Sequence, residues 1–445
     1  CSRLWNRPKP CCLNASVREV SGLTVWKSAE VVPIPKVKPP RDLQNDLRPI
    51  SLLPTAAKVL ESFIRKWILD SVTPQVDPCQ FGCLAGKSTL HALVSLLHTW
   101  TSALDASQSV RAVFVDFRKA FDLVDHNILM MKLRRKAVPE PLCKWFYSFL
   151  YNRRQRVRIT GHRTSGWLTL NGGMPQGSLL GSLSFIIHID DLKLLCDLLK
   201  YVDDTTLSEI LKSSSALSHM QDFLDQLSVW ASDNNMQINP SKTKEMILGG
   251  ASRRDQPALI LGGKTLERVD IFKLLGVYIS ADLRWDGHID YIVSKASGRL
   301  YFLKQLKRAG LPPSHLLHFY LTVIRPILEY ASPLWHPTLT KAHAEQIEAI
   351  QRRALNIIYP AMVGAPYIFA LTFGDIPSLQ SRRLQHLKEF FQKIRQPDNC
   401  LHHLLPPERD SAVTSRLRKA SLYPIPRLRT VRYCSTITYV LKHFQ

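Results

Sequence analysis

Apolar residues recur along this chain with two kinds of spacing, and together they predict a protein of mixed helices and strands. Spacings of three and four residues, the period of a helix face, mark several helices. Runs rich in β-branched and aromatic residues mark strands or hairpins. The predicted helices cover 55–69, 142–150 and 218–231, and the predicted strands cover 29–36, 112–115, 200–208, 236–248 and 272–279. From about residue 286 the pattern is helical and basic.

Two of these strands lead directly into acidic residues. The apolar run 112–115 ends at Asp116, as expected where a buried strand opens at the edge of a site. The hairpin 200–208 carries Asp203 and Asp204 at its tip. Neighbouring like charges repel, so a chain that holds them together usually supplies a cation. We therefore expect Asp116 and Asp203 to meet on adjacent strands and to hold two Mg²⁺ ions, the arrangement used for phosphoryl or nucleotidyl transfer.

Other acidic residues compete for this role or have ordinary structural explanations. Asp190 and Asp191 form a second pair, but a helix rather than a strand leads into it. Asp122 and Asp125 follow the first candidate on a short helix or turn, where capping is the expected role.

The segment 80–89 resembles a phosphate-binding loop without satisfying its pattern. That loop needs four residues between its glycines, whereas three separate Gly82 from Gly86, and no strand precedes them. The pattern therefore excludes an ATPase of this kind. Ser88 is instead predicted to cap a helix that runs through Leu97.

Basic residues at two places could contact phosphate. Lys36 and Arg48 flank a predicted loop and could hold a triphosphate, since both supply charge and donors for phosphate oxygens. Ordinary surface charge is the alternative, and their spacing alone favours it. Four arginines between residues 153 and 158 fit a phosphate backbone and a solvated hairpin about equally well.

Composition narrows the class of partner. The 445 residues carry a formal charge of +23, and aromatic residues among the basic ones favour nucleic acid over a basic structural or solubility role. Nine cysteines without paired spacing indicate a reducing compartment, nuclear or cytoplasmic. No apolar run approaches the ~20 residues of a membrane span, so no membrane is expected. The first residue is Cys and no leader pattern follows it, which predicts a fragment or a processed piece.

Taken together, motifs from about Trp26 to Tyr359 resemble the reverse transcriptases of non-LTR (LINE-type) retrotransposons, particularly the jockey-like sort. They occur in the order typical of that family. The motifs are Ile34-Pro-Lys36 with Arg48-Pro-Ile-Ser-Leu52, Phe114 to His126, Gly173-Met-Pro-Gln-Gly-Ser178, Tyr201-Val-Asp-Asp204, Asn239 to Thr243, and Leu275-Gly276-Val277, with a helical stretch at 324–335.

The resemblance implies an α+β fold, a right-hand polymerase with fingers, an antiparallel-sheet palm and a helical thumb. It implies that Asp116, Asp203 and Asp204 are catalytic metal ligands and that Lys242 donates a proton to pyrophosphate. The residues that it implies for substrate binding are Lys36, Arg48, Phe121, Gln176 and Gly177. We expect an N-terminal remnant at 1–24, fingers and palm at 25–289, a thumb at 290–365 and a basic C-terminal region at 366–445.

The reaction implied is RNA-directed DNA synthesis. A DNA 3′-hydroxyl, from a primer or a nicked target, would attack a dNTP on an RNA template with two Mg²⁺ ions, or Mn²⁺ as an alternative, while Phe121 excludes a ribose 2′-hydroxyl. Departures from the family pattern at Leu84, Ser182 and Leu274 leave a second hypothesis, a decayed or domesticated copy that binds RNA without polymerising. A group II intron maturase is disfavoured by the short segment after the thumb. No endonuclease domain is recognised, which indicates either its loss or a fragment.

Overall fold

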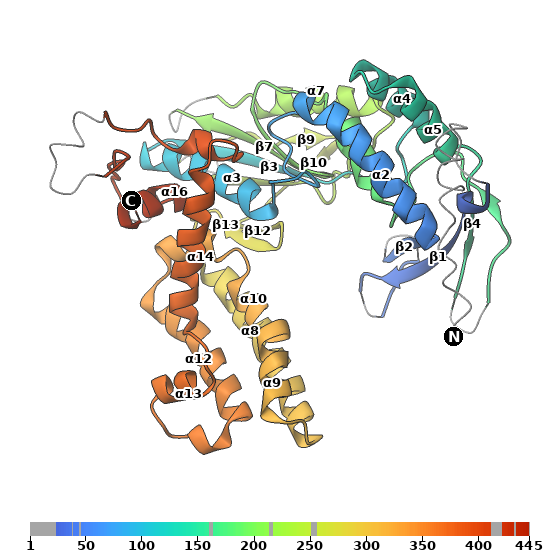
Figure 1. Cartoon of the computed structure of the whole chain (residues 1–445). Coiled ribbons are helices and arrows are strands. Elements are labelled where there is room, and N and C mark those ends of the chain that lie inside the picture. Colours follow the sequence, from blue (N-terminus) through green and yellow to red (C-terminus); the bar gives the residue numbers. More distant parts are fainter. Residues whose placement is uncertain are drawn as a thin grey trace.

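The structure, a computed structural model, describes residues 24–37, 39–43, 46–159, 163–212, 217–250, 256–410, 421–430 and 433–444. Figure 1 shows a central sheet with a strand-rich region at one end and a group of long helices at the other. Both ends extend to the same side of the central sheet, so the molecule has the outline of an arch. The predicted α+β class is confirmed. The predicted N-terminal remnant lies outside the described residues except for Thr24.

Five strands form the central sheet, called the palm sheet below, in the order β11-β8-β3-β7-β6. Neighbours are antiparallel except β11, which runs parallel to β8. The predicted strand before Asp116 is the central strand β3, and every one of its residues is buried. The strands are β3 (Ser109–Val115), β6 (Asp197–Tyr201), β7 (Asp204–Leu211), β8 (Lys244–Leu248) and β11 (Glu267–Arg268).

The alternation of side chains along β3 explains why it is buried on both faces. Val110, Ala112 and Phe114 join a core that includes α3 (Thr89–Asp105) and the C-terminal helices. Val113 and Val115 join a second core, built from helices of the first half of the chain. A strand packed on both faces fixes the position of the residue that follows it, Asp116.

A smaller sheet at one end of the molecule, called the finger sheet below, has the order β2-β1-β4-β5. The predicted helix at 55–69 is confirmed and continues to Val72. Its buried side chains belong to the second core, together with helices that follow β3. The elements are β1 (Ser28–Pro35), β2 (Leu47–Leu52), β4 (Arg154–Val157), β5 (Leu168–Thr169), α2 (Thr55–Val72), α4 (His126–Arg135), α5 (Glu140–Leu150), α6 (Leu179–Ile189) and α7 (Met220–Asp233).

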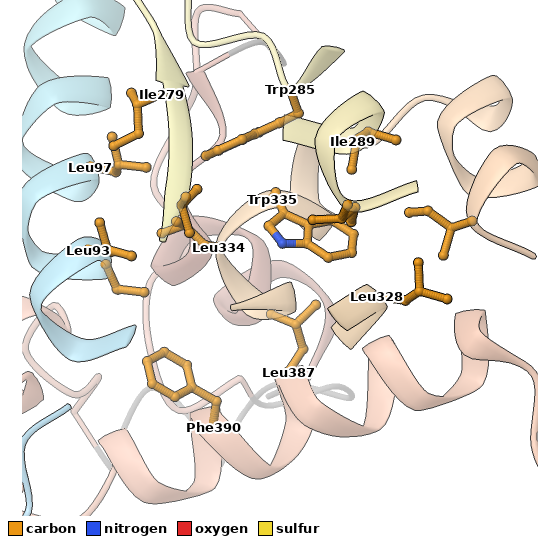
Figure 2. Packing of buried hydrophobic residues seen from close by; sticks show 14 of the residues in the cluster. Leu93, Leu97, Ile279, Trp285, Ile289, Leu328, Leu334, Trp335, Leu387 and Phe390 are labelled. Atoms are coloured by element: carbon orange, nitrogen blue, oxygen red, sulfur yellow. The ribbon is translucent and has the colours of Figure 1, made fainter. Parts of the chain in front are cut away.

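From Asp286 to Leu404 the chain is mostly helical, as predicted, and these helices share the first core with the palm sheet. Figure 2 shows the centre of that core, where Trp335 lies among side chains from α3, β13 (Val277–Ser280), α8 and α14. The Trp335 indole donates to the Tyr330 carbonyl at 3.1 Å, so its one polar atom is satisfied. The elements are α8 (Asp286–Arg308), α9 (Pro313–Phe319), α10 (Arg325–Glu329), α11 (Ser332–Trp335), α12 (Lys341–Ile358), α13 (Tyr367–Phe373), α14 (Leu379–Ile394) and α16 (Thr436–His443).

Two predicted elements differ in detail from the structure. Ser88 caps its helix as predicted, but α3 runs on to Asp105 because its inner face stays apolar. The segment 272–279 forms a hairpin, β12 (Ile271–Leu274) and β13 (Val277–Ser280), since Leu275 and Gly276 turn the chain with φ of 45° and 86°.

The predicted domain division at 289–290 falls within α8, and one core spans that point. The division therefore stays a prediction. No helix in the described part of the chain is long and apolar enough to span a bilayer.

Shortening Leu387 of α14 tests the shared core. Its side chain is fully buried, so Leu387→Ala should lower the free energy of unfolding by about 2–5 kcal/mol, because it removes apolar contacts and leaves a cavity. Chemical denaturation followed by circular dichroism measures this change. The matched control is Leu195→Ala, whose side chain is 91% exposed and whose unfolding free energy should change by less than about 0.5 kcal/mol. Equal losses in both variants would contradict the packing.

Candidate active site

The hairpin of β6 and β7 carries two of the predicted acidic residues to the edge of the palm sheet. Asp203 stands in the turn, and Asp204 is the first residue of β7. β7 pairs with β3 in a register that sets Val115 opposite Thr205, so the next residue, Asp116, follows opposite Asp204. The structure therefore brings together Asp116, which follows β3, and the adjacent pair Asp203 and Asp204 of the β6–β7 hairpin.

These three carboxylates are close enough to influence one another's pKa. Desolvation by the surrounding protein raises the pKa of Asp204 to about 6, and repulsion from Asp203 and Asp116 adds to the effect. Desolvation also raises the pKa of Asp203, with a further contribution from the Asp116 charge. The site thus holds several acidic groups whose charged forms are destabilised until a cation neutralises them.

The segment before β8 holds Asp116 in place. The Asp116 backbone N–H donates to the Thr243 hydroxyl at 3.2 Å, and its carbonyl accepts from the Asn239 N–H at 2.7 Å. Desolvation raises the pKa of the Asp116 carboxyl, and three neighbours oppose that shift: the Lys242 charge, a hydrogen bond from the Asn239 side chain and the Lys36 charge. The predicted proton donor Lys242 therefore lies within electrostatic reach of Asp116.

Lys36 and Arg48, the predicted phosphate-binding pair, belong to neighbouring strands. In the β1–β2 register Ile34 lies opposite Arg48, and the Lys36 N–H donates to the Asp46 carbonyl at 2.7 Å. Desolvation raises the pKa of Asp122 as it does that of Asp116, and the Lys36 charge opposes both shifts. The structure therefore brings Lys36 toward the aspartates and places Arg48 at an exposed position on the adjacent strand.

The glycine-rich segment connects the finger sheet with the chain after Asp116. The Gln176 carbonyl accepts from the Ser51 N–H of β2 at 2.7 Å, and the Gln176 side chain hydrogen-bonds Asp122. Gly177 has a φ of 110°, and a Cβ there would lie 2.9 Å from the Ser51 carbonyl oxygen. Only glycine fits this close approach without moving β2.

Phe121 packs against the second core. Its ring centroid lies 5.4 Å from that of Phe185, and its carbonyl accepts from the Met174 N–H at 2.7 Å. The side chain is only partly buried, so this packing fits both the predicted exclusion of a 2′-hydroxyl and an ordinary core role.

The competing acidic pair has structural partners. Asp190 is buried, forms an ion pair with Lys136 and accepts from the Asp77 N–H at 2.8 Å. Asp191 pairs with Lys132 at 2.7 Å. Ion pairs already neutralise both carboxylates, which favours a structural role for this pair.

Two other predictions are resolved by local contacts. Asp125 caps α4, as predicted, by accepting from the N–H groups of Asn127 and Ile128. Arg156 and Arg158 both pair with Glu30 of β1, which supports the hairpin interpretation of the arginine-rich segment over the phosphate one.

Sequence reasoning named Lys242 but gave no role to its neighbours Asn239 and Thr243, which contact Asp116 directly. Their spacing of four residues around a turn was the available signal. The turn is visible in the structure as a hydrogen bond from the Thr243 N–H to the Asn239 carbonyl at 2.9 Å. It explains why the strand predicted from residue 236 begins only at Lys244.

A divalent cation fits the donors at this edge. Within the described ranges, no three His, Cys, Asp or Glu side chains form a ready-made metal cluster. The carboxylate oxygens of Asp116, Asp203 and Asp204 are nevertheless the ligands that hard divalent cations prefer. Their raised pKa values have the sign expected of ligands whose charge a cation would compensate.

Comparison with known families gives one broad match. The family model described as "Reverse transcriptase (RNA-dependent DNA polymerase)" matches residues 34–279. A second model, "Alkylated DNA repair protein alkB homolog 8, N-terminal", matches only residues 285–325, which include α8. The first match covers every candidate residue named above.

Curated relatives point the same way. The chain is 28% identical over 351 residues to the probable RNA-directed DNA polymerase from transposon X-element of Drosophila melanogaster, covering 75% of this chain and 38% of that protein. It is 28% identical over 359 residues to the RNA-directed DNA polymerase from mobile element jockey of the same species, covering 77% and 38%. The chain thus spans about two fifths of the length of these relatives.

Solved structures are more distant. A telomerase from Candida tropicalis, in complex with a TWJ fragment of telomeric RNA, aligns with 84% of this chain and 59% of its own, with a TM-score of 0.45 and 12% identity.

The raised pKa of Asp204 predicts that the metal-free protein loses stability as the pH rises. A carboxyl whose pKa is higher in the folded state stabilises the fold below its ordinary value of 3.8, and that contribution is lost as the pH rises through about 6. Asp204→Asn removes this dependence. It should stabilise the metal-free protein at pH 7.5 by about 1 kcal/mol, and by less at pH 5. The gain is smaller than the full pKa shift implies, because the neighbouring protein desolvates the carboxyl but the residue is exposed and water screens part of the interaction.

Thermal unfolding of both proteins in EDTA at the two pH values measures this difference. The control is Asp222→Asn, which changes an exposed carboxylate on α7. A stabilisation by Asp204→Asn that is the same at pH 5 and pH 7.5 would show that the shift is absent.

Proposed function

The chain belongs to the reverse transcriptase family, and on that premise we propose that it is the RNA-directed DNA polymerase of a non-LTR retrotransposon. The observation that carries the proposal is the meeting of Asp116, Asp203 and Asp204 at one edge of the palm sheet. Two basic residues, Lys36 and Lys242, lie within electrostatic reach of Asp116. Carboxylates for metal beside cations for phosphate are what a nucleotidyl transferase needs.

We propose that Asp116, Asp203 and Asp204 hold two Mg²⁺ ions, with Mn²⁺ as an alternative. When bound, such ions would activate a DNA 3′-hydroxyl and neutralise charge on the leaving pyrophosphate. The hydrogen bonds of Asn239 and Thr243 to Asp116 would orient that carboxylate before metal binds.

The basic residues would bind and orient the incoming dNTP. Lys36 would contact the triphosphate, because it already lies within electrostatic reach of two carboxylates of the site. Arg48, exposed on the neighbouring strand, would reach the same phosphates. Lys242 would hold a proton at Nζ for the leaving pyrophosphate.

The glycine-rich segment would support the template and the nucleotide. Gln176 contacts both β2 and Asp122, so it would connect movement of the finger sheet to the nucleotide site. Gly177 would allow that contact because it has no Cβ. Phe121 would exclude a ribose 2′-hydroxyl.

The partners implied are an RNA template, a DNA primer or nicked target DNA, and dNTPs, in the nucleus or the cytoplasm. The net charge of +23 supports a polyanionic partner. The division into fingers and palm at 25–289, thumb at 290–365 and basic C-terminal region at 366–445 remains part of this proposal. The second candidate, a copy that binds RNA without polymerising, is favoured by the departures at Leu84, Ser182 and Leu274.

Primer extension by the purified protein on a homopolymer RNA template with Mg²⁺ tests the proposal. Asp116→Asn and Asp203→Asn should each abolish nucleotide addition, because each removes a charge from the metal site, and should leave RNA affinity within about twofold. Asp190→Asn is the control, since it changes a carboxylate paired with Lys136 and should retain most of the activity.

Two outcomes would contradict this assignment. Activity that depends on Asp190 and survives the change at Asp203 would move the metal site to the other acidic pair. RNA binding without extension by the unchanged protein would support the non-polymerising copy.

Phe121→Val separates the two roles of Phe121. If the ring excludes a 2′-hydroxyl, the variant should stay folded and gain ribonucleotide incorporation, because the smaller side chain opens that space. If the ring serves only the core, the variant should lose about 1–3 kcal/mol of stability and still reject ribonucleotides. Extension with single ribonucleotides, beside a thermal melt, distinguishes them. Phe185→Val, which alters the fully buried ring that Phe121 packs against, is the control for a core effect.

A further inference from the structure

The segment 77–82, called the clamp segment below, lies beside the aspartate hairpin. The Lys200 N–H of β6 donates to the Cys79 carbonyl at 2.9 Å, and the Phe81 N–H donates to the Lys200 carbonyl at 2.8 Å. Gln80 and Lys200 form a parallel bridge. The clamp segment therefore extends the edge of the palm sheet beside the last residues of β6.

The turn that it borders has an unfavourable backbone conformation. Val202, between Tyr201 and Asp203, has a φ of 60°. A β-branched residue rarely adopts this left-handed region, and it does so only where its surroundings hold it there. The direction of the next residue, Asp203, depends on that conformation.

The Gln80 side chain helps to keep Val202 in this conformation. It is fully buried, and its Oε1 accepts from the Val202 N–H at 3.1 Å and from the Gly82 N–H at 2.8 Å. Its Nε2 is buried with no hydrogen-bond partner in the described part of the chain. The acceptor oxygen is thus the part of this side chain that the structure uses.

Gly82 also helps to keep Val202 in this conformation, because it lies directly against the turn. A Cβ at this position would lie 2.5 Å from Val202 Cγ2 and 2.6 Å from the Val202 nitrogen. Backbone atoms of the turn occupy the space that any other residue would need. The turn therefore has Gly82 directly against it and cannot relax in that direction.

Two lysines, the buried Lys200 and the half-buried Lys87, anchor the clamp segment. Lys200 is fully buried, pairs with Asp77 at 2.8 Å and donates to the Leu192 carbonyl at 2.7 Å. Lys87 donates to the Pro78 and Gln80 carbonyls at 2.9 and 2.7 Å. The lysine that resembles the lysine of a phosphate-binding loop is therefore occupied by the clamp segment.

We propose that Gln80 and Gly82 are positioning residues that hold the Val202–Asp203 turn, so that Asp203 and Asp204 face Asp116. The expected effect on nucleotide addition rests on the proposed function, whereas the effect on the conformation of the turn does not. Neither residue would touch substrate. They would act through the backbone of the hairpin, and their loss should lower the rate of nucleotide addition more than substrate binding.

Three variants of the full chain test this proposal. Gln80→Met keeps the side-chain volume and removes the acceptor. Gln80→Glu keeps an acceptor oxygen and exchanges the unused amide nitrogen for a second carboxyl oxygen. Gly82→Ala inserts the Cβ. Gly250→Ala is the matched control, because a Cβ there meets nothing within 4 Å. Three measurements apply to each: amide hydrogen exchange at Val202, Mn²⁺ binding by electron paramagnetic resonance, and kcat and KM for dNTP.

In Gln80→Met we expect the Val202 amide to lose protection, Mn²⁺ affinity to fall about tenfold, and kcat to fall roughly 10- to 100-fold with KM within twofold. Gly82→Ala should show the same losses of Mn²⁺ affinity and kcat. Gln80→Glu should stay within about threefold of the unchanged protein in both, since Lys87 lies beside this residue. Gly250→Ala should change none of these values.

Unaltered exchange at Val202 in Gln80→Met would overturn the proposal, as would a Gln80→Glu variant as impaired as Gln80→Met. If the unchanged protein adds no nucleotide, the proposed function fails while exchange and Mn²⁺ binding still decide whether Gln80 and Gly82 hold the turn. If Gln80→Met does not fold, Gly82→Ala and Gln80→Glu decide by the same measurements.

Discussion

The desolvation of three neighbouring aspartates, together with repulsion among them, is the constraint on which the arrangement of this molecule depends. Asp116, Asp203 and Asp204 lie at one sheet edge with pKa values raised by desolvation, and for Asp203 and Asp204 also by the charge of neighbouring aspartates. Such a group lowers stability unless rigid surroundings hold it and a cation compensates it. The rigidity comes from β3, which is packed on both faces and ends directly at Asp116. The two apolar cores therefore stabilise the fold and also fix the position of the acidic site.

Buried ion pairs support the same sheet from within. Arg111 of β3 pairs with Glu245 of β8 at 2.7 Å, and Arg268 of β11 contacts the same carboxylate at 2.9 Å. On the other side of the sheet, Lys200 at the end of β6 pairs with Asp77. Removing one partner of such a pair leaves a buried charge uncompensated, so the pairs that involve Glu245 favour the pairing of β8 with β3 and with β11.

The helices after residue 286 pack against the palm sheet through one shared core. Their apolar side chains share one core with α3 and with one face of β3, and Trp335 lies at its centre (Figure 2). The hairpin β12–β13 and helix α14 contribute to that core as well. Movement of these helices relative to the palm sheet would therefore require repacking of buried side chains, because close-packed interiors do not deform gradually. The helices are thereby held in a fixed relation to the aspartates.

The sequence by itself determined most of the elements and predicted an acidic site. Hydrophobic period predicted α2, α7 and β3, and the position of Asp116 and Asp203 at strand ends predicted an acidic site, because both signals are local. Tertiary structure alone decided which residues support that site. Gln80 and Val202 are 122 positions apart, and the motif containing Gln80 resembled an incomplete phosphate loop. Asn239 and Thr243 likewise reach Asp116 only when β8 pairs with β3. Hydrogen bonds between residues far apart in the chain produce no repeating pattern in the sequence. Only the folded structure therefore identifies these partners.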